Sequence, residues 1–150
     1  MQKLNFPKYN FRFKNNENKT LIFDIIRKKF VILTPEEWVR QHTLHFLITE
    51  KKYPVSYINV EKQLLLNDSV KRYDIVIFKN DGDVEIIIEC KAPSITINQV
   101  SFDQIARYNL ALNSNLLMVT NGLTHYFCKM DIKNKRYLFL RDLPKYNQLK

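Results

Sequence analysis

The chain has 150 residues, of which 45% are hydrophobic and 13% aromatic, and this composition excludes an intrinsically disordered protein. The length predicts one domain with a hydrophobic core, and no apolar run reaches the roughly eighteen residues that a membrane-spanning helix needs. The net charge of +9 favours polyanionic partners through phosphate contacts, although a Lys-rich composition alone would also produce it.

The N-terminal segment, residues 1–19, is polar and basic with scattered aromatic side chains, and we expect a loosely packed arm. Residues 20–150 are expected to form a single domain. Met1 to Asn10 lacks the apolar core of a signal peptide, so we expect a cytoplasmic protein without a membrane partner. Thr20 to Ile26 and Lys29 to Leu33 are predicted to form two short strands or an irregular hairpin that leads into a helix.

A helix is predicted from Thr34 to about Thr49. Thr34 is a favourable N-cap, Pro35 occupies the first helical position, and Glu37 follows the cap by three residues as in a capping box. A strand from Tyr57 to Leu66 should follow. It would lie beside the next strand, joined to it by the turn Asn67-Asp68-Ser69.

The next stretch reads as an antiparallel hairpin. The β-branched runs Tyr73 to Phe78 and Val84 to Ile88 flank an Asp-Gly pair at Asp81 and Gly82, a strong hairpin signal. The expected loop pairs Asn80 with Asp83. Counting back along both strands then places one acidic residue opposite another.

These acidic residues are Asp74 and Glu89, and the two-residue period of a strand adds Lys91 to their face. Opposed carboxylates repel each other, so a cation should lie between them. Lys91 supplies one positive charge, but a hard divalent cation suits two carboxylates better. The alternative is a solvated hairpin with a surface ion pair. It is weakened because Val84 to Ile88 is typical of a buried strand, where unpaired charges are costly.

A second helix is predicted from Ser101 to Asn113, and it places Gln104 and Tyr108 one turn apart on one face. A structural alternative is that Gln104 completes a capping box with Ser101 and that the Tyr108 ring packs on the sheet. Cys90 and Cys128 fit neither a disulfide framework nor a zinc site, so both should be core residues. Further strands are predicted at Leu116 to Thr120, Leu123 to Met130 and Tyr137 to Leu140.

Asp74 followed by Glu89-Cys90-Lys91 resembles the D…(D/E)xK motif of the PD-(D/E)XK nuclease superfamily, with Tyr73 at the position of the usual proline. The sequence around this motif resembles, more specifically, the N-terminal nuclease domain of type I restriction enzyme R subunits. The matching segments are Thr34 to Gln41, Arg72-x-Asp74, Gln104-x-x-x-Tyr108 and Thr120-Asn121-Gly122. The predicted order of elements agrees with the restriction-endonuclease-like α-β-β-β-α-β core of this superfamily, an α/β (α+β) fold. Its mixed central sheet is flanked by helices, and extra N- and C-terminal strands are expected here.

The resemblance implies roles for particular residues. Asp74, Glu89 and the backbone carbonyl of Cys90 would hold Mg²⁺, with Mn²⁺ able to substitute, and Lys91 would position water and offset charge on the phosphate. The first helix of the family often directs a carboxylate toward the site, here Glu36 or Glu37, with Glu37 slightly favoured. The alternative is that Glu37 only caps the helix at Thr34. The remaining candidates are Gln104 and Tyr108 as catalytic residues, and Arg40, Arg72 and Arg107 as nucleic-acid contacts.

The function that the sequence supports best is a Mg²⁺-dependent endonuclease domain that hydrolyses phosphodiester bonds in DNA. Other restriction-modification subunits are candidate partners, and the oligomeric state stays open, with a homodimer among the alternatives. No G-x-x-x-x-G-K-[ST] motif occurs in these 150 residues, so we expect no translocase motor in them. The first alternative is a non-catalytic nucleic-acid-binding or assembly module of the same fold. The second is a basic protein-interaction domain.

Overall fold

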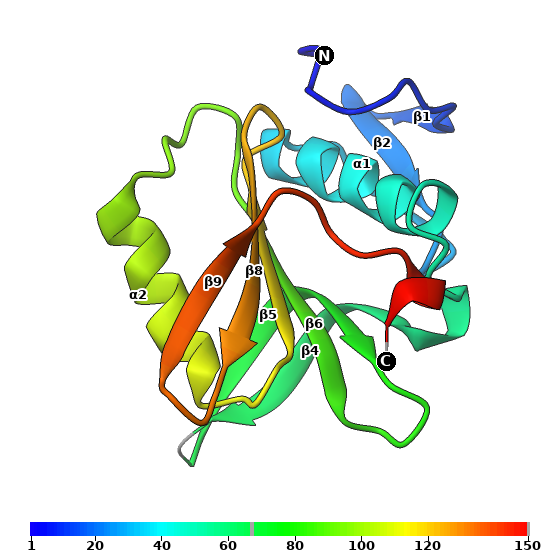
Figure 1. Cartoon of the computed structure of the whole chain (residues 1–150). Coiled ribbons are helices and arrows are strands. Elements are labelled where there is room, and N and C mark those ends of the chain that lie inside the picture. The colour runs from blue at the N-terminus through cyan, green and yellow to red at the C-terminus, as the bar shows by residue number, and fades with distance from the viewer. Residues whose placement is uncertain (67, 150) are drawn as a thin grey trace.

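A computed structural model describes residues 1–66 and 68–149 (Figure 1). Helix α1 (Pro35–Thr49) packs on one face of a six-stranded sheet, and α2 (Gln99–Leu110) packs on the other. The strand order is β4-β5-β6-β7-β8-β9. These strands are β4 (Ile58–Leu66), β5 (Ser69–Phe78), β6 (Val84–Cys90), β7 (Leu116–Thr120), β8 (His125–Asp131) and β9 (Arg136–Leu140).

The predicted α-β-β-β-α-β core is confirmed as α1-β4-β5-β6-α2-β7. Strands β6 and β7 are parallel, and α2 forms the crossover between them, whereas the other neighbouring strands are antiparallel. β9 is the predicted edge strand. The predicted turn between β4 and β5 includes Asn67, which lies outside the described residues. Short 3₁₀ turns at Val55–Tyr57 and Tyr146–Gln148 complete the elements.

Helix α1 begins as predicted. Thr34 is the N-cap, and its Oγ1 accepts a 3.0 Å hydrogen bond from the backbone N–H of Glu37. The Glu37 carboxylate does not close the predicted capping box, because it binds Arg27, Arg40 and Gln41 instead. The Thr34 hydrogen bond of the capping box therefore forms, whereas the Glu37 side chain takes part in a tertiary ion network instead.

The hairpin register is confirmed on the side of the acidic pair and wrong at the loop. Ile75 pairs with Ile88, which places Asp74 and Glu89 at the next opposed positions. A β-bulge next to Ile77 then shifts the pairing by one residue. The backbone N–H of Lys79 donates to the carbonyl of Asp83, so the predicted Asn80–Asp83 pair is replaced by a three-residue loop. Gly82 closes that loop with a φ of +92°.

Helix α2 begins two residues earlier than predicted. Asn98 is its N-cap and forms a capping box with Ser101, so the predicted box between Ser101 and Gln104 is wrong. The helix ends at Leu110. Its buried residues are Phe102, Ala106 and Asn109.

The predicted N-terminal arm makes specific contacts with the rest of the chain. Leu4 is 5% exposed and belongs to the core beneath α1, and the N–H of Asn5 donates to the carbonyl of Gly122. Burial of these apolar side chains anchors the segment. Residues 13–32 form a separate antiparallel sheet of β1 (Phe13–Asn16), β2 (Lys19–Asp24) and β3 (Lys29–Ile32). Helix α1 lies between this small sheet and the six-stranded sheet (Figure 1).

Two hydrophobic clusters fill the two faces of the six-stranded sheet. The cluster on the α1 face includes Val39, Leu44, Ile86 and Ile88. The cluster on the α2 face includes Phe102, Ala106, Ile87 and Leu117. Cys90 and Cys128 are both buried and unoxidised, as predicted for core positions.

Candidate active site

Asp74 and Glu89 lie where the β5–β6 ladder ends. The last backbone-paired residues are Ile75 and Ile88. Beyond them, Oδ2 of Asp74 accepts a 2.7 Å hydrogen bond from the backbone N–H of Cys90. The Asp74 carboxylate thus holds β6 beside β5 at the position where the regular ladder stops.

Strand β5 loses its side-chain alternation at Asp74. Ile75 and Ile77 pack in the cluster on the α1 face, but Tyr73 packs with Val76 in the cluster on the α2 face. On the neighbouring strand β4, the residue opposite Asp74 is Glu61, whose φ is +57°. A non-glycine residue with positive φ inside a strand is rare. It costs free energy and therefore persists only where the surrounding structure imposes it. This local distortion accompanies the acid that the sequence identified as central.

The environment of Asp74 disfavours its anion. Its side chain is 18% exposed. Burial, and after it the negative charge of Glu89, raises the pKa of Asp74 to about 7, although the Cys90 N–H and Arg40 act in the opposite direction. Glu36 also contributes to the increase, which places its charge within electrostatic reach of the site. Asp74 and Glu89 therefore form an electrostatically coupled pair, as the register predicts.

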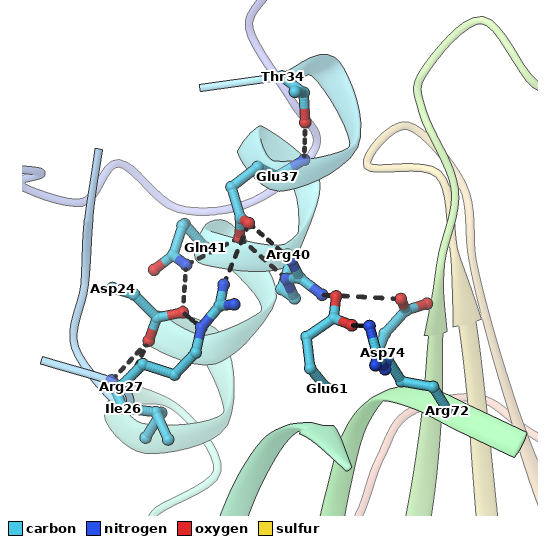
Figure 2. Close-up of polar contacts among 10 residues, drawn as sticks. All are labelled: Asp24, Ile26, Arg27, Thr34, Glu37, Arg40, Gln41, Glu61, Arg72 and Asp74. Carbon is cyan, nitrogen blue, oxygen red and sulfur yellow. Dashed lines mark hydrogen bonds and ion pairs between the residues drawn. The ribbon is translucent and has the colours of Figure 1, made fainter. Parts of the chain in front are cut away.

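Arg40 lies beside Asp74 in a buried ion network (Figure 2). Its guanidinium donates to both oxygens of Glu37 at 2.9 and 2.6 Å and also binds Glu61. One of its nitrogens lies 3.8 Å from Oδ1 of Asp74. Arg40 is only 8% exposed and paired with carboxylates, and its contact with nucleic acid remains a prediction.

Glu37 reaches the site only through Arg40. Burial alone would raise the pKa of Glu37, but the hydrogen bonds and charge of Arg40 outweigh burial and hold this pKa below its ordinary value. The carboxylate also accepts hydrogen bonds from Arg27 and Gln41. Glu37 thus holds the arginine that lies next to Asp74, and its direct part in the reaction remains a prediction.

The network continues from Glu37 to the small sheet. Asp24, at the end of β2, is fully buried and accepts hydrogen bonds from the side chains of Arg27 and Gln41. Its Oδ1 also accepts the backbone N–H groups of Ile26 and Arg27. A chain of polar contacts thus runs from the small sheet, across α1, to Asp74 (Figure 2).

Glu89 has a different cationic partner. Lys71 of β5 lies 3.3 Å from Oε1 of Glu89, and its Nζ is 4.2 Å from the ring centre of Tyr108 and 4.8 Å from that of Tyr73. Lys71 therefore brings the predicted residue Tyr108 of α2 close to Glu89. The Tyr73 hydroxyl is buried and has no hydrogen-bond partner among the described residues.

Lys91 follows β6 directly. Its backbone N–H donates a 2.8 Å hydrogen bond to the carbonyl of Thr120, which extends the pairing with β7 by one residue. The side chain is half-buried and forms no ion pair within the described part of the chain. The ammonium group of Lys91 is therefore not committed to a carboxylate, unlike that of Lys71.

The Asn121-Gly122 turn supports the loop that follows Lys91. The Asn121 side chain donates to the carbonyl of Ile95 in that loop and accepts the backbone N–H groups of Leu123 and Thr124. Gly122 has a φ of +86°, and a Cβ at this position would lie 2.9 Å from the Leu4 side chain. The turn thereby joins the N-terminal segment to the loop that carries Lys91.

The other predicted residues lie at the surface. Gln104 and Arg107 are exposed on α2 and, in residues 1–66 and 68–149, make no hydrogen bond or ion pair with the two acids. The Arg72 side chain is 60% exposed, with Nη1 3.7 Å from Glu61. These three residues are available to a ligand, and their contacts with nucleic acid remain predictions.

The donor set fits a hard divalent cation. The carboxylates of Asp74 and Glu89 and the carbonyl of Cys90 are oxygen donors of the kind that Mg²⁺ prefers. A pKa of about 7 for Asp74 means that Arg40 and the Cys90 N–H do not fully stabilise its anion, so added positive charge would be favourable. No group of three His, Cys, Asp or Glu side chains suited to a metal occurs among the described residues. Water or phosphate would have to complete the coordination.

Sequence reasoning missed Glu61 and Lys71. Both are the nearest oppositely charged neighbours of predicted site residues, Glu61 for Arg40 and Lys71 for Glu89. Continuing the β4–β5 pairing would have placed Glu61 opposite Asp74, and this register was the signal available. For Lys71 the only hint was its position on the same strand as Asp74.

Comparison with known proteins identifies the family of the chain. No curated protein matches the chain. In the described residues, neither helix is long and apolar enough to span a bilayer. The family described as Type I restriction enzyme R protein N terminus matches residues 35–144, a region that begins with α1 and contains the whole six-stranded sheet. Because this match covers most of its length, the chain belongs to the family of type I restriction enzyme R protein N-terminal domains, and the predicted resemblance to that family is confirmed.

Proposed function

We propose that this domain is a metal-dependent deoxyribonuclease that hydrolyses phosphodiester bonds in DNA within a restriction-modification system. The observation that carries the proposal is the coupled pair of Asp74 and Glu89 at the end of the β5–β6 ladder, directly followed by Lys91. A carboxylate with a perturbed pKa, such as Asp74, is typical of catalytic sites. Membership of the family supports the same reading.

Asp74, Glu89 and the carbonyl of Cys90 would hold Mg²⁺ or Mn²⁺. When bound, the ion would polarise the scissile phosphate and lower the pKa of a coordinated water. Asp74 would lose its proton on loading, because its pKa is close to neutral and metal ligands bind as anions. The Cys90 N–H would meanwhile keep one Asp74 oxygen fixed.

Lys91 would supply the positive charge for the reacting phosphate. Its backbone is held against Thr120, whereas its ammonium group is not engaged by a carboxylate among the described residues. Such a group can stabilise charge that develops in the transition state. Tyr108, Gln104 and Arg107 of α2, together with the exposed Arg72, would contact the DNA backbone and the groups around it.

Arg40 and Glu37 would act as positioning residues. The bidentate Glu37 carboxylate fixes the guanidinium, and the guanidinium then lies 3.8 Å from Asp74. In this arrangement Arg40 would partly offset the negative charge of the two acids before a metal arrives.

Incubation with supercoiled plasmid in Mg²⁺ or Mn²⁺ tests the proposal. The wild-type protein should nick or linearise the plasmid, and EDTA should stop the reaction. Asp74→Ala and Glu89→Gln should abolish cleavage, whereas the matched variant Asp83→Asn, in the exposed β5–β6 loop, should retain it. Cleavage that persists in Asp74→Ala would rule out this active site.

A second candidate is a non-catalytic nucleic-acid-binding or assembly module. The specific observation in its favour is that the chain already pairs each acid with a cation, Arg40 for Asp74 and Lys71 for Glu89. Under this alternative, the wild-type protein binds DNA but cleaves it no faster than Asp74→Ala in either metal.

A further inference from the structure

The two faces of the small sheet of β1, β2 and β3 differ in their contacts with α1. Ile22 and Asp24 of β2 are fully buried, and Asp24 accepts a hydrogen bond from Gln41 of α1, so their side of the sheet packs against the helix. The alternation of β2 turns Leu21 and Phe23 to the opposite side. Their opposed partners lie on that side too, and the outer face consists of Lys14, Leu21, Phe23, Phe30 and Ile32.

Aromatic rings and cations lie together on this outer face. Phe23 and Phe30 are directly paired, with ring centres 5.2 Å apart, and neither ring belongs to the two hydrophobic clusters of the described residues. Two cationic side chains, Arg12 and Lys14, lie over these rings. The Arg12 guanidinium carbon lies 4.3 Å from the Phe23 ring centre and 5.6 Å from that of Phe30, and the Lys14 ammonium lies 5.7 Å from the Phe30 ring centre.

Arg12 and Lys14 are available to bind an anionic ligand. In the described part of the chain, no ion pair joins Arg12 or Lys14 to a carboxylate. The surrounding charge has the same sign. Residues 1–30 contain eight Lys and Arg residues against only Glu17 and Asp24, so they carry six of the nine net positive charges of the chain.

We infer that the outer face of the small sheet binds single-stranded DNA, with bases on Phe23 and Phe30 and phosphates on Arg12 and Lys14. Sheets that bind single strands combine these two features, because every base has a π-face that can stack on an aromatic ring and a basic groove can follow the backbone. A duplex keeps its base faces inside its own stack, so only unpaired bases can reach the rings.

This binding site is separate from the nuclease site. The small sheet precedes the region that matches the R protein family, residues 35–144. It is nevertheless tied to Asp74 through the polar contacts of Asp24, Glu37 and Arg40 (Figure 2). The inference adds a single-strand contact to the proposed nuclease without depending on cleavage.

The test is fluorescence anisotropy with a dye-labelled oligothymidylate of about 16 nucleotides, the upper site size of common single-strand modules. EDTA is present, and the salt concentration is about 50 mM so that phosphate contacts are retained. The single strand should bind more tightly than a duplex of equal length. Phe23→Leu and Phe30→Leu remove the π-face but keep apolar bulk, and each should weaken single-strand binding at least about fivefold. The matched control Phe139→Leu, on the exposed edge strand β9, should leave it unchanged.

The cations are tested by the double variant Arg12→Ala/Lys14→Ala, which should reduce the slope of log affinity against log salt by about two. Lys129→Ala/Lys133→Ala, at exposed positions in and after β8, is the control that should keep the slope. Both Phe variants should keep the wild-type melting temperature within a few degrees; if one does not, the Arg12/Lys14 variant and the comparison of single strand with duplex decide the question.

Three outcomes would overturn the inference: equal binding of single strand and duplex, wild-type affinity in both Phe variants, or binding of anionic phospholipid vesicles without binding of the oligonucleotide. Asp74→Ala should bind the oligonucleotide like the wild type. If the wild-type protein binds the oligonucleotide but does not cleave the plasmid, the nuclease proposal alone is refuted. If it cleaves the plasmid but does not bind the oligonucleotide, this inference alone is refuted.

Discussion

The backbone N–H of Cys90 donates to the carboxylate of Asp74 over 2.7 Å, and this bond replaces the next rung of the β5–β6 ladder. Two properties of the site follow from it. One oxygen of Asp74 is fixed at the end of β6, and the acid is held where burial, and after it the charge of Glu89, raises its pKa.

The first prediction concerns metal binding. Millimolar Mn²⁺ should raise the melting temperature of the wild type, because a ligand that binds only the native state stabilises it, by about 2.7 kcal/mol at a hundredfold excess over Kd. Asp74→Asn should abolish the rise, and Asp83→Asn should preserve it. Differential scanning calorimetry measures both. An equal rise in the wild type and in Asp74→Asn would place the metal elsewhere.

The second prediction concerns pH. The pKa of Asp74 is about 7 in the folded protein, above its ordinary value of 3.8, so the native state binds more protons than the unfolded state between these values. Its contribution to stability is therefore full below about pH 4 and is lost as the pH rises through 7, by an amount on the order of 2–4 kcal/mol. Urea unfolding at several pH values should show this decrease for the wild type.

Asp74→Asn is the matched variant for this titration, because it keeps the shape and cannot ionise. Its free energy of unfolding should decrease less than that of the wild type over the same pH range. Parallel curves for the two proteins would mean that Asp74 titrates at its ordinary pKa. In the wild type, saturating Mn²⁺ should also flatten the curve, since the bound ion favours the ionised acid.

The third prediction separates catalysis from binding at Lys91. Lys91→Ala should reduce cleavage by roughly 10²–10⁴-fold, the scale for a lost proton-transfer or charge-stabilising group. Metal-induced stabilisation and DNA affinity should stay nearly intact. Gln104→Ala should give a milder version of the same pattern, and Lys129→Ala should have no effect. If Lys91→Ala unfolds the domain, the lysine has a structural role, and unchanged cleavage would exclude it from catalysis.

The fourth prediction concerns the buried arginine. Arg40→Met should destabilise the protein by about 3–5 kcal/mol, because it leaves the buried Glu37 carboxylate without its main partner. Arg72→Met, whose side chain is 60% exposed, should change stability by less than about 1 kcal/mol. Chemical denaturation compares the two. Similar small losses would mean that the network around Arg40 contributes little to the fold.

Some of this site could be predicted from local sequence. The Asp-Gly loop fixed the approximate hairpin register, which brought Asp74 opposite Glu89, and Thr34 with Pro35 marked the start of α1. The bulge beside Ile77 altered only the loop end, so the error there did not reach the acids. These features depend on residues within a few positions of one another, and turn and cap preferences describe such neighbours well.

Other parts of the site depend on contacts between distant segments. Arg40 binds Glu61, which lies twenty-one residues later in the chain, and no local pattern around Arg40 indicates this contact. Nothing in the local pattern of β4 marks Glu61 as a residue with positive φ. The N-terminal residues looked unstructured because their few apolar side chains, such as Leu4, show no period, and their burial depends on Gly122.

The contact between Leu4 and Gly122 also bears on how this protein can be handled. Asn5 donates to the carbonyl of Gly122, and the adjoining Asn121 holds the loop after Lys91 through Ile95. Removing the first five residues from a recombinant fragment would therefore remove contacts that support the loop after Lys91. A shortened preparation that fails to cut DNA would therefore not test the proposed nuclease, so activity assays need protein that retains residues 1–5.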